Sequence, residues 1–167
     1  MTDLTDEQKT EYFRRSYTAA DGLWFMKVEE RLGFEEALRM DEAVWKVLPK
    51  IQGRTLKRMM HLECGLQGLQ QALSVRLALE GFDYEIETRE AGFVVIVKMC
   101  PWHDAMMKAG REKLSKRVSD LICRVENSVW ASEFRAAEGE DDCREIRFEQ
   151  EERICQGERR CVLRFER

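Results

Sequence analysis

The 167-residue sequence lacks several features, and each absence limits what the protein can be. It contains only two prolines and no low-complexity tract, so no linker divides it and we expect one domain over residues 1–167. No apolar run approaches the roughly 20 residues that span a bilayer. The net charge of −4 gives no basic surface for nucleic acid. Neither a membrane nor a nucleic acid is therefore expected as a partner.

Motifs that identify common enzyme classes are also absent. The sequence has only two histidines, and it shows no Ser–His–Asp arrangement, no phosphate-binding glycine loop and no dinucleotide fingerprint. The first seven residues are polar and acidic, unlike a secretory signal. We therefore expect a cytoplasmic protein whose cysteines stay reduced. The oligomeric state is left open, a homodimer included.

What the sequence does contain is a change of hydrophobic period at Gly81. Before it, apolar residues recur at helical spacing, which predicts a helical part over residues 1–81. Thr5, followed three residues later by Gln8, is typical of a capping box at the start of the first helix. The pair Asp21-Gly22 predicts a kink or break in that helix.

Two more helices are expected in the helical part. One covers about residues 34–48, and Pro49 is expected to bend or end it. The other keeps helical spacing from Met59 to Leu77.

After Gly81 the apolar residues alternate with polar ones, which indicates strands. Residues 82–88 read as a half-buried strand and residues 93–99 as a buried central strand, so the two form a hairpin. Two helical segments follow, and a second hairpin is expected from Ile146 to Phe165. The predicted fold class is α+β, with an N-terminal helical layer packed on a four-stranded antiparallel sheet made of two β-hairpins. Residues 82–167 would form the α+β part that carries a cysteine site.

Four of the six cysteines lie where this fold could bring them together. Cys100 ends the predicted central strand, Cys123 lies in an amphipathic helix, and Cys155 and Cys161 flank a turn at Gly157. Converging thiolates in a reduced compartment bind a metal or do redox chemistry: zinc takes four such ligands, and an iron–sulfur cluster takes four thiolates. The alternative is that each cysteine is a small buried hydrophobe. Cys64 and Cys143 receive no role.

Two further residues near these cysteines are candidates for chemistry. Strand alternation places Glu152 on the same face as Phe148, and a carboxylate in an apolar layer needs a partner such as a cation. Glu152 is therefore an alternative metal ligand. His103 follows Cys100 by three residues, which makes the two a candidate base and nucleophile. The alternative is a surface histidine in the first turn of a helix.

Two stretches of the chain resemble known families. The first runs from Asp21 to Glu29 and continues with Gly33, Ala37 and Trp45, and the second combines Cys100, Cys123 and the terminal segment Cys155 to Phe165. The pattern is similar to that of an uncharacterised cytosolic protein family related to L-2-amino-thiazoline-4-carboxylate hydrolases. This resemblance implies a metal held by Cys100, Cys123, Cys155 and Cys161. The chain departs from that pattern at Glu126, where an aspartate is expected.

The C-terminal segment also has a more distant similarity to 4-vinyl-reductase-type small-molecule-binding domains. That resemblance implies zinc held by Cys123, Glu152, Cys155 and Cys161 beside a pocket for an aromatic ligand. The gap between the last two cysteines is shorter here than in those domains.

Three hypotheses about function follow. The first is a cytosolic metal-binding domain with structural zinc held by cysteines, which binds a small organic molecule. The second is a metal- or cysteine-dependent hydrolase of a small heterocyclic, thiazoline-like substrate, with Cys100 and His103 as catalytic candidates. The third is an iron–sulfur redox protein.

Overall fold

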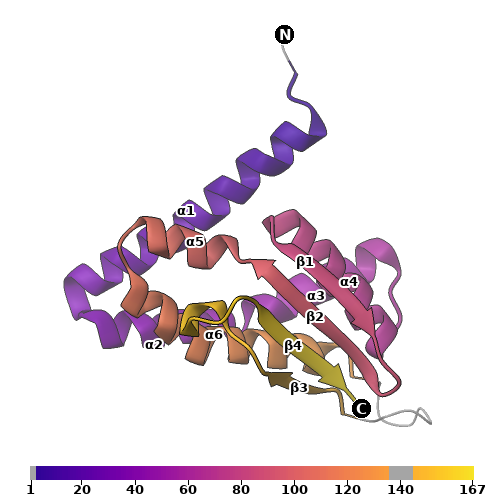
Figure 1. The fold of residues 1–167 in the computed structure, drawn as a ribbon. Coiled ribbons are helices and arrows are strands. Elements are labelled where there is room, and N and C mark those ends of the chain that lie inside the picture. Colours follow the sequence, from indigo (N-terminus) through magenta and orange to yellow (C-terminus); the bar gives the residue numbers. More distant parts are fainter. Residues whose placement is uncertain (1–2, 136–144) are drawn as a thin grey trace.

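The computed structural model describes residues 3–135 and 145–167. Within these ranges the chain forms helices and strands in the order α1 (Asp6–Leu32), α2 (Phe34–Trp45), α3 (Leu48–Met60), α4 (Leu66–Glu80), β1 (Asp83–Thr88), β2 (Gly92–Met99), α5 (Pro101–Lys108), α6 (Glu112–Glu133), β3 (Arg147–Gln150), the short 3₁₀ turn η1 (Ile154–Gln156) and β4 (Cys161–Glu166). Figure 1 shows the strands on one side and the helices behind them.

The four strands form one antiparallel sheet in the order β1-β2-β4-β3. β1 and β2 are the first hairpin, and β3 and β4 are the second. The two hairpins join where β2 pairs with β4, with Phe93 opposite Phe165 and Val97 opposite Cys161. The predicted α+β class and the four-stranded antiparallel sheet are both confirmed.

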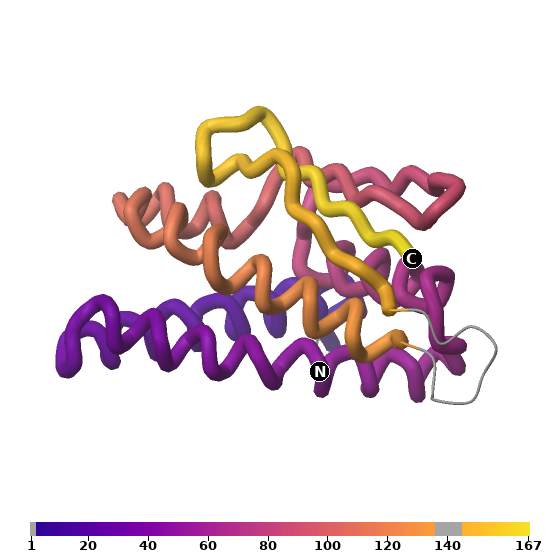
Figure 2. Tube along the Cα trace, turned by 90° about the horizontal axis from the view of Figure 1, so that it is seen from below, coloured from indigo at the N-terminus to yellow at the C-terminus, as the bar shows by residue number. Residues whose placement is uncertain are grey.

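Helix α6 is the central helix of the molecule. It contacts α2 and α3 on one side and β3 and η1 on the other, and Figure 2 shows it between those helices and the sheet. Helix α4 packs on β1 and β2. The N-terminal half of α1 extends away from the rest of the chain (Figure 1).

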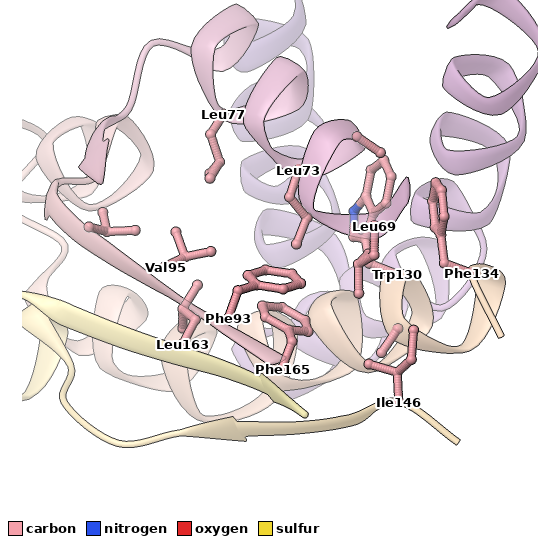
Figure 3. Close-up of a cluster of buried hydrophobic side chains, with 13 residues drawn as sticks. Leu69, Leu73, Leu77, Phe93, Val95, Trp130, Phe134, Ile146, Leu163 and Phe165 are labelled. Atoms are coloured by element: carbon pink, nitrogen blue, oxygen red, sulfur yellow. The ribbon is translucent and has the colours of Figure 1, made fainter. Parts of the chain in front are cut away.

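The main core lies between the inner face of the sheet, α4 and the C-terminal half of α6. The rings of Phe93 and Phe165 stack with their centroids 5.0 Å apart, and Trp130 stacks on Phe134 at 6.3 Å. Figure 3 shows these rings beside the leucines of α4. Because each fully buried side chain of this size stabilises the fold by about 1.5–3 kcal/mol, this cluster fixes how α4 and α6 sit on the sheet.

The first helix is not broken at Asp21-Gly22. α1 runs unbroken from Asp6 to Leu32, and the Thr5–Gln8 capping box is present, with hydrogen bonds of 2.9 and 3.2 Å. A glycine inside a helix lowers its stability without forcing a break, which explains why Gly22 does not interrupt it.

The predicted boundaries of the next helices are also wrong. Pro49 lies in the first turn of α3, where its missing N–H has no helical partner to lose, so it begins a helix instead of ending one. The segment predicted as one helix from Met59 to Leu77 is divided, because α3 ends at Met60, His61 after it adopts the left-handed conformation, and α4 begins at Leu66. Leu62 in the connection still packs against the main core, which is why the apolar spacing continued across the break.

No helix in residues 3–135 and 145–167 is both long enough and apolar enough to cross a membrane.

Candidate functional site

A cavity of about 210 Å³ lies between the helices and the inner face of the sheet. Helices α1, α2, α4, α5 and α6 contribute to its wall, as do β2 and β4. Most of this wall is apolar, and it includes the rings of Phe25, Trp45, Phe82 and Trp102. Trp45 and Trp102 meet edge to face with their centroids 5.8 Å apart. The volume is below the roughly 300 Å³ at which typical ligand pockets begin, so the cavity suits a small molecule.

Three of the four predicted cysteine ligands, Cys100, Cys123 and Cys161, line this cavity. Cys100 is there because β2 ends at Met99 and Pro101 starts α5, which makes Cys100 the N-cap residue. Its sulfur accepts the backbone N–H of His103 at 3.5 Å. Cys161 is the first residue of β4, and its sulfur accepts the backbone N–H of Ile154 at 3.4 Å.

Cys155, the fourth predicted ligand, lies in η1, and η1 packs against α6, the helix that carries Cys123. The turn that allows this ends at Gly157, whose φ of 97° favours glycine. We call Cys100, Cys123, Cys155 and Cys161 the thiol cluster. Its members come from four separate segments of the chain.

The pKa values show that these thiols act on one another. Burial, with a smaller contribution from the nearby Cys155 and Cys161, raises the pKa of Cys100 to about 12, against the lowering effect of the His103 N–H. Burial, followed by the proximity of Cys100, raises the pKa of Cys123 well above its usual range. Burial also raises the pKa of Cys161, against the lowering effect of the Ile154 N–H. Without a cation, these three thiols therefore stay protonated at neutral pH.

In the described part of the chain, no group of three or more His, Cys, Asp or Glu side chains is arranged to hold a metal ion. By their chemistry alone, the four thiols of the cluster are the kind of donor that a thiophilic metal takes. The charges of the other three affect the pKa of Cys123. Zinc and iron–sulfur clusters are both bound by four cysteines.

Glu152 does not point into the apolar layer as strand alternation predicted. β3 ends at Gln150, so the alternation does not continue to residue 152. The carboxylate instead makes two bonds of 2.9 and 3.0 Å to the guanidinium of Arg160, which lowers the pKa of Glu152. A metal site that used Glu152 would have to break this ion pair.

Cys100 and His103 lie together, but their side chains do not form a nucleophile–base pair. The ring Nδ1 of His103 lies 2.8 Å from the hydroxyl of Ser115, which is buried. The contact from His103 to the Cys100 sulfur is made by the backbone N–H. Of the two cysteines without a predicted role, Cys64 is exposed and Cys143 lies outside the described residues.

The ionisable groups of the cavity wall were not predicted from the sequence. Asp21, Asp41, Arg76, Arg111 and Glu126 all line it. One signal in the sequence could have identified part of this set. On α4, the charged residues Arg76 and Glu80 occupy the same buried face as Leu69 and Leu73, and a charge inside an apolar stripe needs a partner.

Comparison with known proteins gives one match. A family model described as "Family of unknown function (DUF6125)" matches residues 5–146. No curated protein and no solved structure matches the chain.

Proposed function

The chain belongs to this family of unknown function, and from the geometry of the site we propose that it is a small-molecule-binding domain whose thiol cluster holds a metal, most simply a structural zinc ion. The natural compartment for such a site is the cytoplasm, where free thiols stay reduced.

The observation that supports the metal proposal is that Cys100, Cys155 and Cys161, from three other segments, all contribute to the raised pKa of Cys123. Burial raises the pKa of Cys100, Cys123 and Cys161, so the thiolate forms are unfavourable when the cluster is alone. A divalent cation reverses this preference, because a coordinating thiol loses its proton. Such an ion would fasten η1 and β4 to α6 and to the start of α5, and residues of β4, α6 and α5 line the cavity.

The small-molecule proposal rests on the cavity itself. It is concave and mostly apolar, and it contains a few polar groups, which are the general properties of ligand sites. A zinc ion held by four cysteines leaves no coordination position for substrate. With four cysteine ligands, a structural metal beside a binding cavity is a simpler proposal than a metal-dependent hydrolase. The high pKa of Cys100 likewise disfavours a hydrolase that uses its free thiolate.

Metal analysis of the protein purified without oxygen tests the metal proposal. We expect about one zinc per chain, and Cys123→Ser and Cys161→Ser should lose most of it and unfold at a lower temperature. Cys64→Ser is the matched control, because Cys64 is exposed and is not part of the cluster. If the analysis finds iron and the protein shows a charge-transfer absorbance, the metal is an iron–sulfur cluster and not zinc. Wild type without metal, or Cys161→Ser with its full metal content, would contradict the proposal.

A further inference from the structure

We propose that the cavity binds an organic ammonium ion, meaning an amine or protonated nitrogen heterocycle with a small apolar body, and that Asp21 and Asp41 neutralise its charge. This inference rests on the proposed small-molecule function and names the class of ligand.

The two cations of the cavity wall are already neutralised. Arg76 is 2.5 Å from a carboxylate oxygen of Glu126 and 3.0 Å from one of Glu80. Arg111 makes an ion pair of 2.7 Å with Glu29. Neither guanidinium therefore offers an unpaired charge to an anionic ligand.

The two aspartates of the wall are not neutralised. Within residues 3–135 and 145–167, neither Asp21 nor Asp41 forms an ion pair with a lysine, arginine or histidine. The side chain of Trp45 lies near enough to lower the pKa of Asp41, whereas the charge of Asp21 raises it. Burial raises the pKa of Asp21 to about 6 and that of Asp41 to about 7. A bound cation would remove the cost of holding both carboxylates ionised in this apolar wall.

Asn127 adds an amide group to the cavity wall. Its side chain lines the cavity and is only 4% exposed. Its amide nitrogen donates to the backbone oxygen of Cys123 at 2.7 Å. Its amide oxygen accepts no hydrogen bond from the described residues, so it can accept one from a ligand that reaches it in the cavity. An ammonium group carries up to three donors and no acceptor, which matches two carboxylates and an amide oxygen.

The aromatic part of the wall suits the same ligand. Trp45 and Trp102 present indole rings to the cavity, and Trp45 lies beside Asp41. Tryptophan is the most favourable ring for a cation held over its face. The remaining wall would accept the apolar body, for which a volume of about 210 Å³ sets the limit.

Three probes of matched shape and different charge test this proposal. At pH 7.5, 2-phenylethylamine should bind the wild-type protein at least about tenfold more tightly than 2-phenylethanol. Phenylacetate should bind more weakly than the alcohol. Ligand-detected NMR titration measures all three. In Asp21→Asn/Asp41→Asn the preference for the amine should fall to about twofold or less, whereas the alcohol should bind as before.

The control variant Asp6→Asn/Asp83→Asn removes the same two charges from exposed positions, and it should keep the tenfold preference. The three-probe comparison in wild type decides the matter even if the double variant does not fold. Equal or tighter binding of the alcohol or the carboxylate overturns this inference alone. If none of the three probes binds at millimolar concentration, the proposed small-molecule function fails together with it. The metal content of the thiol cluster tests a separate claim.

Discussion

Arg76 of α4 and Glu126 of α6 form a buried ion pair, with 2.5 Å between Nη2 and Oε1. The side chains are 6% and 9% exposed, so water contributes little to their solvation. Arg76 also binds Glu80 one turn further along α4, so one guanidinium compensates two carboxylates. This contact ties the two helices together at the edge of the cavity.

Removal of Arg76 should therefore be strongly destabilising. Arg76→Met leaves Glu80 and Glu126 buried without a cation, and we expect a loss of about 3–5 kcal/mol in the free energy of unfolding. The double variant Arg76→Met/Glu126→Gln should recover part of this loss, because one uncompensated charge is gone. Urea denaturation measures both values. Arg54→Met is the control, since the Arg54 side chain is 66% exposed in its pair with Glu133, and it should cost about 1 kcal/mol or less. Equal losses for the two arginines would contradict this account.

Asp41→Asn should stabilise the protein in a pH-dependent way. Burial raises the pKa of Asp41 from 3.8 to about 7, so the folded protein holds this proton where the unfolded chain has released it. The contribution of Asp41 to stability is therefore fully present below about pH 4 and is lost as the pH rises through 7. The variant lacks this loss.

Thermal unfolding from pH 4 to 8 measures the difference between Asp41→Asn and wild type. It should be near zero at pH 4 and grow to about 1–2 kcal/mol at pH 8, after allowance for partial exposure of the carboxyl. Asp83→Asn, at an exposed position in β1, should show no such trend. A difference that shrinks with rising pH would refute the assignment.

Two glycines should respond in opposite directions to alanine. A Cβ at Gly22 meets no atom within 4 Å, so Gly22→Ala should stabilise α1 by about 0.5–1 kcal/mol through helix propensity. A Cβ at Gly92 would lie 1.9 Å from the backbone oxygen of Phe165, so Gly92→Ala must displace β2 from β4. We expect a loss of about 2–4 kcal/mol there. Destabilisation by Gly22→Ala would show that the helix needs a glycine at this point.

The sheet could be predicted from the sequence because its signal is local. The residues of β2 are almost all apolar and those of β1 alternate, and these two patterns fix which strand is central. The helix boundaries were harder to predict. Pro49 is compatible with two local structures, since a proline can lie at the start of a helix or end one. Leu62 is ambiguous too, because a leucine can pack against the core from a loop as well as from a helix.

The cavity could be predicted only in part. Cys100, Cys123 and Cys161 lie on its wall, and the sequence could point to them because their segments are predicted to meet. Asp21 and Asp41 come from different helices, and their shared place on the cavity wall depends on how α1 packs on α2. The predicted orientation of Glu152 is wrong for a different reason. Strand alternation predicts an inward face for Glu152, but β3 ends two residues earlier, at Gln150, and alternation assigns no face outside a strand.

The reactivity of individual cysteines tests the environment of the thiol cluster. In metal-free, folded protein at pH 8, Cys64 is exposed and should be alkylated by iodoacetamide at the rate of an ordinary thiol. Burial raises the pKa of Cys100 to about 12 from 9.0, so its thiolate fraction is about a thousandfold lower. We expect Cys100 and Cys123 to react at least about 100-fold more slowly than Cys64. Mass spectrometry of the digested protein resolves each site.

Addition of zinc separates protection by burial from protection by a metal. Cys155 is only partly buried, so burial alone should leave it accessible to the reagent. If the thiol cluster binds zinc, one equivalent should slow alkylation of Cys155 by tenfold or more, because a coordinated thiolate is no longer a free nucleophile. Cys64 lies outside the cluster and should react at the same rate with and without zinc. If Cys155 reacts at the same rate with and without zinc, Cys155 is not a ligand. Rapid alkylation of Cys100 in the folded protein would show that the site is open to water.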